Sequence, residues 1–346
     1  DLLAVWFSTE SEKGREMTIL ASRLRSGADR WEPSNEFFKA PDRNMTGSSL
    51  FNDSKGKIYY FNGLEASTGW ANLAVVMRTS DDNGSTWSVP RLICPEHQRR
   101  NQIISGTSQT KDGVMIQPCD LVQSAEGGTA IHISRDNGLT WRDPGQGEPV
   151  TSYAQEGQGS TIAGIHAGVV GLTDGRLLAF GRRNNINDKM PMSISQDMGK
   201  TWTYSASEFE PIGGGQRLVL MRLLDGGLFF ASFTGPFDKG MTIDMVKTMK
   251  FKANDGSEFD GKGLYAAMSY DEGKSWPVRK LLTPGIGEYN TWGHTRQFKA
   301  DATHAEPRGY LAATQTPDGM IHLISSGLHY RFNTAWLREP NQAPKD

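Results

Sequence analysis

An octapeptide that occurs four times constrains the fold of this chain more than any other feature. Its copies begin at Ser80, Ser134, Ser195 and Ser269, and each ends in tryptophan. All four obey the pattern Ser-x-Asp-x-Gly-x-[Thr/Ser]-Trp, which chance does not produce four times in 346 residues. A repeated octapeptide indicates a repeated structural unit, and such repeats decide the architecture of the whole chain.

Each position of the octapeptide suits a turn between two antiparallel strands. Glycine adopts a positive φ without steric strain, and aspartate accepts hydrogen bonds from backbone N–H groups about two residues on. Tryptophan supplies a large apolar ring that packs under a neighbouring strand while its N–H finds a partner. Short strand-like runs such as 73–77 and 129–133 precede the copies. We therefore expect these aspartate and tryptophan residues to fold the protein rather than to catalyse a reaction.

The sequence ahead of each copy follows one order of elements: an apolar run, an Asp-Gly type of turn, a second run, a loop and a third run. In the unit that ends at Ser195 the three runs begin at Ile165, Arg176 and Met190, and the turn is Asp174-Gly175. Three strands ahead of the octapeptide and one after it make a four-stranded antiparallel sheet.

Six such units fit into the chain. Two of them, over 1–31 and 309–336, lack a complete octapeptide, and the third run of the last unit covers 329–336. Six four-stranded sheets predict an all-β fold, a six-bladed β-propeller in which 1–346 forms one domain without long helices. The first unit lacks its inner strand in this chain, so we expect residues upstream of Asp1 or the C-terminus to supply it.

The composition excludes several classes of protein. A net charge of −2 argues against a general nucleic-acid surface, and no run of about 18 apolar residues is present that would span a membrane. The seven histidines show no two-ligand spacing on one strand face, so we expect no metal and no cofactor. Cys94 and Cys119 either form a disulfide or remain small buried residues.

Four such octapeptides on six blades resemble the Asp-box or BNR repeats of the sialidase superfamily, and the resemblance covers nearly the whole chain. It implies a secreted or periplasmic carbohydrate-active protein that binds a glycan. Sialidases hold the substrate carboxylate with three arginines and use a tyrosine nucleophile assisted by glutamate, with an aspartic acid as proton donor. Their first arginine lies in a Phe-Arg-Ile-Pro-like motif, which is absent here; the region that would hold it precedes Asp1. The superfamily also includes other exo-glycosidases, some lyases on related propellers and proteins that are not enzymes.

The face opposite the octapeptides is expected to hold the site. It is built from loops that enter the inner strands and loops that join second to third strands. Arginine there fits an anionic sugar, because a planar guanidinium holds a carboxylate with two parallel hydrogen bonds. Arg100 and Arg217 are the favoured pair, with Arg43 or Arg308 as the third. The predicted substrate-binding residues are Arg43, Asn44, Arg100, Asn101, Gln102, Arg182, Arg217, Trp292, His294 and Arg308.

Four residues are predicted to take part in catalysis. Glycoside cleavage needs a proton donor and a nucleophile or base on opposite sides of the anomeric carbon, and Glu65 and Asp120 are the candidate acids. His166 stands among small residues at the end of an apolar strand, where an imidazole can serve as general acid or base. The resemblance, through loop order, implies Tyr289 as the nucleophile with Glu288 near it.

Three functions remain open on these residues. The leading one is a sialidase-like exo-glycosidase that hydrolyses a terminal, acidic sugar. The second is a polysaccharide lyase, in which arginine and amide groups neutralise a uronate carboxylate while His166 or a tyrosine removes the C5 proton. The third is a glycan-binding protein without catalysis. The oligomeric state is left open.

Overall fold

The computed structural model describes all residues of the chain except 54, 67–68, 95–100, 105, 122–126, 147, 149–155, 292, 294 and 345–346. Strands dominate the described part, which also holds the short helix α1 (Thr334–Arg338) and the 3₁₀ turn η1 (Ile243–Met245). The chain divides into two compact units, Asp1–Val150 (unit 1) and Thr151–Asp346 (unit 2). No helix among the described residues is long and apolar enough to cross a bilayer. That 1–346 forms a single domain stays a prediction.

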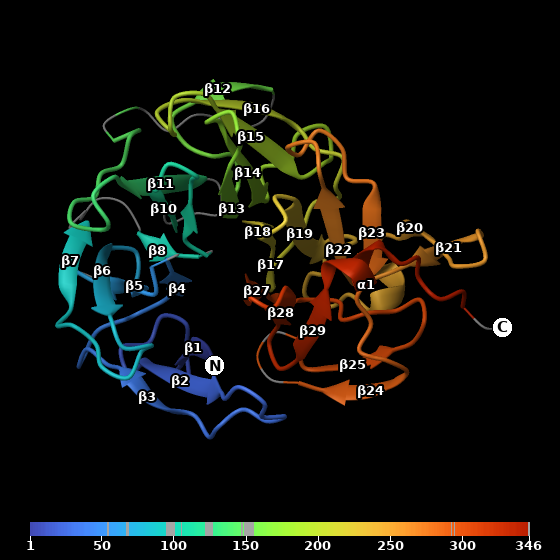
Figure 1. The fold of residues 1–346 in the computed structure, drawn as a ribbon, viewed down its shortest axis with the longest axis horizontal. Coiled ribbons are helices and arrows are strands. Elements are labelled where there is room, and N and C mark those ends of the chain that lie inside the picture. Colours follow the sequence, from blue (N-terminus) through green and yellow to red (C-terminus); the bar gives the residue numbers. More distant parts are fainter. Residues whose placement is uncertain are drawn as a thin grey trace. The chain divides into compact units, whose positions relative to one another are not determined.

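Unit 1, which runs from blue to green in Figure 1, contains three consecutive antiparallel sheets. The first is β1 (Leu2–Ser8), β2 (Thr18–Leu24) and β3 (Asn35–Phe38). The second is β4 (Ser48–Asn52), β5 (Ile58–Glu65), β6 (Leu73–Ser80) and β7 (Arg91–Cys94). The third is β8 (Gln102–Ile103) and β9 (Ser108–Gln109), which both pair with β10 (Met115–Asp120), followed by β11 (Thr129–Ser134). The sheets match the predicted units, with no inner strand in the first one within the described residues.

Unit 2, which continues to the red end in Figure 1, contains three further blade sheets. The first is β13 (Ile165–Gly171), β14 (Leu177–Arg182), β15 (Pro191–Ser195), β16 (Trp202–Ala206) and β12 (Gly157–Gly159). The second is β18 (Val219–Arg222), β19 (Leu228–Phe233), β22 (Leu264–Ser269) and β23 (Val278–Leu281), and the third is β27 (Ala312–Gln315), β28 (Met320–Ile324) and β29 (His329–Asn333). Three two-stranded additions are β17 (Gln216–Arg217) with β26 (Gly309–Tyr310), β20 (Met249–Lys252) with β21 (Glu258–Gly261), and β24 (Gly287–Asn290) with β25 (Gln297–Ala300).

The octapeptides close the turns after the third strand of their blades, as predicted. In the copy at Ser134, the Ser134 hydroxyl accepts a hydrogen bond from the Gly138 N–H at 2.8 Å, and Asp136 accepts one from the Thr140 N–H at 2.9 Å. Trp141 donates its indole N–H to the Gly138 carbonyl at 3.2 Å. The aspartate therefore reaches four residues on, not two, because it spans the whole turn.

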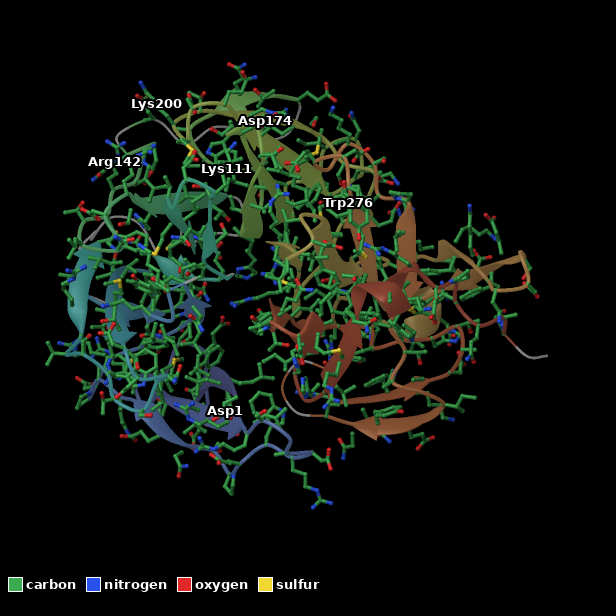
Figure 2. The ribbon with its side chains drawn as sticks, in the orientation of Figure 1. Asp1, Lys111, Arg142, Asp174, Lys200 and Trp276 are labelled. Atoms are coloured by element: carbon green, nitrogen blue, oxygen red, sulfur yellow. The ribbon has the colours of Figure 1, made fainter. Side chains whose placement is uncertain are left out.

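Two successive residues of each octapeptide lie in the left-handed region. The glycine does so as expected, and the residue before it does too: Asn83, Asn137, Met198 and Glu272 have φ between 53° and 63°, with Asn83 at 57°. Trp276, labelled in Figure 2, belongs to the last copy and packs against Phe180, Phe209 and Phe230 in the core of unit 2. The repeats thus fold the blades and contribute to their cores.

The end of unit 2 departs from the predicted strand over 329–336. Strand β29 stops at Asn333, whose side chain accepts a hydrogen bond from the Trp336 N–H at 2.9 Å and so caps α1. An asparagine at the N-cap satisfies an N–H group that has no partner within the helix, which favours helix over a longer strand. Past α1, Asn341 forms a parallel bridge with Ala253, the residue that follows β20.

Candidate functional site

Two segments of unit 2 that lie far apart in sequence meet through the parallel pairing of β17 and β26. The pairing sets Gln216 opposite Gly309 and Arg217 opposite Tyr310. The buried Gln216 amide then holds the surrounding loops. It donates to the carbonyls of Gly235 at 3.0 Å and Pro307 at 2.9 Å, and its oxygen accepts from backbone N–H groups of the loops on both sides. Sequence motifs gave no sign of this brace, because it depends on tertiary contacts.

Arg217, Tyr310 and His166 form one contiguous group on this frame. The Arg217 guanidinium lies 4.1 Å from the centroid of the Tyr310 ring, and the His166 ring meets the same ring edge to face at 6.0 Å. Arg217 is 8% exposed and His166 is 4% exposed. Guanidinium stacking on an aromatic face keeps the N–H edges of the arginine available for a planar anion.

His166 is held in an unusual backbone conformation. Its φ is 54°, in the left-handed region, and the register of β13 against β14 shifts between Ile165 and Gly168. A β-bulge of this kind redirects a side chain, and non-glycine residues in the left-handed region occur with enrichment at functional sites. The left-handed φ and the bulge support a functional role for His166. Its part in catalysis stays a prediction.

Two more of the predicted arginines lie on the same frame. Arg182, at the end of β14, is buried and donates to the Gln216 carbonyl at 3.0 Å. Arg308 lies over the Phe237 ring at 5.1 Å, and its Nε is buried without a hydrogen-bond partner among the described residues. Burial, and then the charge of Arg296, lower the pKa of Arg308. A group of arginines held on one frame favours an anionic ligand.

A buried carboxylate that the sequence analysis did not single out stands two residues before Arg308. Glu306 is fully buried and accepts hydrogen bonds from three hydroxyl groups, those of Thr295 at 2.7 Å, Ser325 at 2.8 Å and Tyr330 at 2.9 Å. Burial raises its pKa, although the three hydroxyls oppose the shift. The pKa of Tyr330 is raised too, by burial first and then by the charge of Glu306. Perturbed titratable groups held together in this way mark candidate catalytic positions.

Only proximity in the fold identifies Glu306 and Tyr330 as a pair. They lie 24 residues apart, with Tyr330 on β29 and Glu306 in the segment that leads into β26. The sequence offered one signal for Glu306: it is an acidic residue two positions before Arg308, which was predicted as a site residue.

In unit 1, Glu65 and Asn44 are brought together as parts of a tightly bonded corner. The Glu65 carboxylate is bridged by Arg15, with Nε to oxygen distances of 3.0 and 3.1 Å, and it accepts the Asn44 N–H at 3.0 Å. Burial acts to raise the pKa of Glu65, but the contacts with Arg15, Asn44 and Gly69 outweigh it and the pKa is lowered. A carboxylate of lowered pKa is ionised at neutral pH, which does not favour Glu65 as a proton donor.

The other predicted residues of unit 1 differ in exposure. Arg43 is exposed and lies 3.8 Å from the Asp42 carboxylate. Asp120 and Gln102 are buried and lie opposite each other in the pairing of β10 with β8. Both polar atoms of the Gln102 side chain lack a hydrogen-bond partner in the described part of the chain. Asn101, next to Gln102, donates to the Leu73 carbonyl at 3.2 Å.

Strand β24 places the side chains of Tyr289 and Glu288 on opposite faces. In β24, Tyr289 pairs with Phe298 and Glu288 with Lys299, and neighbouring residues of a strand point to opposite faces. The Tyr289 hydroxyl donates to the Pro284 carbonyl at 2.8 Å, and Glu288 forms an ion pair with Lys299 at 3.3 Å. Among the predicted site residues, Arg100, Trp292 and His294 lie outside the described residues.

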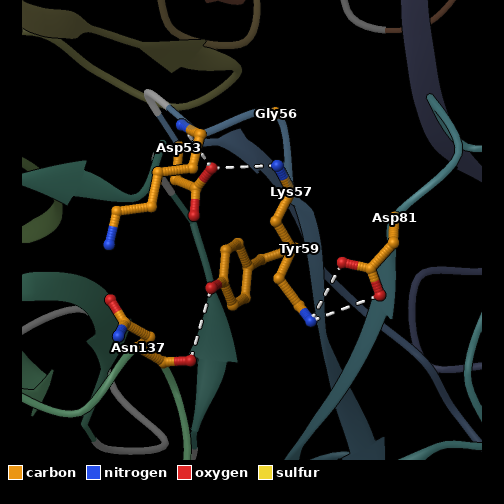
Figure 3. Close-up of a pocket in the computed structure, with 7 residues that line it drawn as sticks. Asp53, Gly56, Lys57, Tyr59, Asp81 and Asn137 are labelled. Carbon is orange, nitrogen blue, oxygen red and sulfur yellow. Dashed lines mark hydrogen bonds and ion pairs between the residues drawn. The ribbon is translucent and has the colours of Figure 1, made fainter.

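A hollow of unit 1, shown in Figure 3, lies beside two of the octapeptide turns and not at the predicted site. Its rim includes Asp81 and Asn137 of two octapeptides, and Lys57 pairs with Asp81 at 3.2 Å. The Tyr59 hydroxyl donates to the Asn137 carbonyl at 3.3 Å, and burial raises its pKa to about 12. The polar groups of this hollow largely satisfy one another, so we do not assign it a function.

Comparison with known proteins agrees with the repeats. A family model described as a BNR repeat-like domain matches residues 1–323. A sialidase of Micromonospora viridifaciens is 26% identical over 274 residues, which cover 75% of this chain and 35% of that protein. A sialidase of Bacteroides fragilis (strain YCH46) is 24% identical over 228 residues, covering 64% of this chain and 36% of that protein. The aligned regions thus span about a third of the length of these two relatives.

A solved structure extends the likeness to the fold. The intramolecular trans-sialidase of Ruminococcus gnavus superposes with a TM-score of 0.59 at 12% identity, over 97% of this chain and 92% of that one. At 12% identity the similarity concerns the fold alone. It agrees with the six antiparallel blade sheets that follow one another along the chain. The chain therefore belongs to the BNR repeat-like family of the sialidase superfamily and has its all-β, six-bladed propeller fold.

Proposed function

We propose that this protein is a sialidase-like exo-glycosidase that hydrolyses a terminal acidic sugar from a glycan. The observation that supports this most is the hydrogen bond from the Tyr330 hydroxyl to the buried Glu306 carboxylate, two residues from Arg308. The resemblance to sialidases implies a tyrosine nucleophile assisted by a glutamate, and this pair has the required contact.

The chemistry follows from the contact. As the Tyr330 oxygen attacks the anomeric carbon, its proton passes to Glu306, to which it is already hydrogen-bonded. Burial raises the pKa of Glu306, which makes its carboxylate a better proton acceptor than an exposed one. A covalent glycosyl-tyrosine followed by attack of water gives two displacements and a product of retained configuration.

Arg217 and Arg308 are the proposed ligands of the sugar carboxylate. Each guanidinium rests on an aromatic ring, Tyr310 for Arg217 and Phe237 for Arg308. Stacking fixes the plane of the guanidinium, so that less conformational entropy is lost when a carboxylate binds in the bidentate mode. Arg100, which was predicted to pair with Arg217, stays a prediction.

His166 is the proposed proton donor for the leaving group, because it adjoins the Tyr310 ring that also supports Arg217. Asp120 and Glu65 remain predicted acids of unit 1. Glu65 is the weaker of these two, since its lowered pKa keeps it ionised.

The decisive experiment compares Tyr330→Phe with wild type on a panel of aryl glycosides of acidic sugars. The expected result is a loss of kcat with the fold intact by circular dichroism. Tyr270→Phe is a matched control, because the Tyr270 hydroxyl also donates to a carboxylate, that of Asp225 at 3.1 Å, but on a side chain that is 50% exposed. Loss of activity in Tyr289→Phe but not in Tyr330→Phe would instead support the nucleophile implied by loop order.

A polysaccharide lyase is the second candidate, and the grouping of His166, Tyr310 and Arg217 favours it. In this reading Arg217 neutralises a uronate carboxylate while His166 removes the C5 proton. Cleavage by β-elimination creates an unsaturated product that absorbs in the ultraviolet, whereas hydrolysis does not. Wild-type protein that binds a glycan but turns over none of the panel would identify the third alternative, a binding protein. Secretion or a periplasmic location stays a prediction.

A further inference from the structure

Three buried polar side chains of unit 1 form a continuous line that the proposed glycosidase chemistry does not use. The Cys94 sulfur lies 3.2 Å from His132 Nδ1, and His132 Nε2 lies 3.3 Å from Asn101 Oδ1. They come from three separate places in the chain: Cys94 ends β7, His132 lies in β11 and Asn101 immediately precedes β8. The exposed fractions are 8% for Cys94, 4% for His132 and 2% for Asn101.

The contacts of Asn101 define the protonation state of His132. The Asn101 Nδ2 group donates to the Leu73 carbonyl at 3.2 Å, which leaves Oδ1 as the atom that faces the imidazole. An amide oxygen only accepts, so His132 Nε2 carries a proton. In a neutral imidazole Nδ1 is then unprotonated and presents its lone pair to the Cys94 sulfur.

We propose that Cys94 is a reactive thiol, a modification site for small electrophiles, with His132 as its base and Asn101 as the positioning residue. The thiol proton moves to His132 Nδ1 and leaves a thiolate beside an imidazolium, while Asn101 holds the ring orientation. Cysteine, histidine and asparagine occur in the same order of contact in the nucleophilic array of papain-like proteases. Here the exposed fraction of the thiol restricts the reagent to a small molecule.

A hydroperoxide is a suitable reagent class, and its reaction balances. The Cys94 thiolate attacks one peroxide oxygen, the O–O bond breaks, and a sulfenic acid forms on sulfur. The departing oxygen takes the proton from the His132 imidazolium and leaves as water, or as an alcohol from an organic peroxide. The thiol is oxidised by two electrons, and the peroxide is reduced by two.

Cys119 provides an internal control in the same apolar cluster. It is fully buried, and its polar contact is with the Gln117 carbonyl at 3.9 Å rather than with an imidazole. Burial raises its pKa, and the nearby charges of Cys94, Asp120 and Asp143 raise it further. Cys94, by contrast, has the imidazole of His132 in direct contact with its sulfur, and an imidazolium beside a sulfur favours the thiolate.

The test measures the rate at which each cysteine reacts in the folded full-length chain. Methyl methanethiosulfonate, a small reagent, is added over a range of pH, and peptide mass analysis assigns the label. We expect Cys94 to react at least about tenfold faster than Cys119 near pH 7, with a rate midpoint below that of an ordinary thiol, because only the thiolate is nucleophilic. Hydrogen peroxide followed by a sulfenic-acid probe is expected to label Cys94 as well.

Variants separate a reactive site from a structural contact. His132→Phe removes the base and is expected to return Cys94 to the rate and midpoint of an ordinary buried thiol. If that variant does not fold, Asn101→Ala keeps the imidazole but not its orientation, and we expect a slower reaction with a midpoint shifted toward higher pH. Labelling of Cys94 only after denaturation would overturn the proposal. A midpoint in folded wild-type protein that equals that of a free thiol and is unchanged in Asn101→Ala would also overturn it.

Discussion

The Tyr330 hydroxyl donates to Oε2 of Glu306 at 2.9 Å, and the hydroxyls of Thr295 and Ser325 both donate to Oε1 of the same carboxylate. Burial of a carboxylate costs stability, and the three hydroxyls offset part of that cost. That cost is reasonable where the carboxylate has a function, and substitution of Glu306 tests whether it has one.

Glu306→Gln is expected to lower kcat by about 10²–10⁴-fold, since an amide cannot take the proton of Tyr330. It is expected to lower stability less at higher pH than at low pH. The folded-state pKa of Glu306 is raised above its unfolded value, so its favourable contribution is present below that unfolded value and is lost as the pH rises through the folded-state pKa. Steady-state kinetics at pH 7 checks the first effect, and thermal unfolding of both proteins over a range of pH checks the second. A stable variant with full activity would remove Glu306 from the mechanism.

Arg217→Lys is expected to reduce kcat/KM by about tenfold or more, because lysine keeps the charge but loses the planar fork and the stack on Tyr310. The matched control is Arg176→Lys, in an exposed Asp-Gly turn where Arg176 pairs with Asp174. Equal kinetics for both variants, measured on the same acidic glycoside, would contradict the assignment of Arg217 to the sugar carboxylate.

The octapeptide aspartates are expected to make the fold sensitive to acid. Side-chain hydrogen bonds from Thr86, Thr140 and Ser275, followed by the backbone N–H groups of the same residues, lower the pKa of Asp82, Asp136 and Asp271 to about 2. A depressed folded-state pKa contributes stability above the ordinary value of 3.8, and that stability is lost as the pH falls toward 2.

The measurement is the thermal unfolding temperature between pH 5 and pH 2, which should fall most steeply below about 4, where the unfolded-state aspartates take up protons. Asp136→Asn removes one of these titrations and should give a shallower pH dependence than wild type. An unfolding temperature that stays constant from pH 4 to pH 2 would contradict the expectation.

Lys280 is expected to anchor the end of the chain. It is 6% exposed, donates to the carbonyls of Glu339 at 2.8 Å and Pro340 at 3.0 Å, and lies 4.4 Å from the Trp336 ring. Lys280→Met removes both hydrogen bonds and is expected to cost about 1–3 kcal/mol of unfolding free energy. Denaturant titration measures it, with Lys274→Met, at an exposed lysine, as the variant expected to change stability little.

Local pattern predicted the blades closely. Strand β11 covers the expected run 129–133 and β13 begins at Ile165 as expected, because turn residues bound the apolar runs. The pattern failed at 329–336, where Asn333 caps a helix. The roles that the resemblance implies for Tyr289 and Glu288 stay predictions, and the strand sends these two neighbouring side chains to opposite faces.

The sequence by itself determined the repeated turns, the blade strands and the family, since each of these depends on residues within a few positions of one another. Only the tertiary structure decided which polar groups meet. The Tyr330–Glu306 pair and the stack of Arg217 on Tyr310 each join residues far apart in sequence, and so do the contacts of His132 with Cys94 and Asn101. Such contacts depend on how strands pair and pack, which no local pattern encodes.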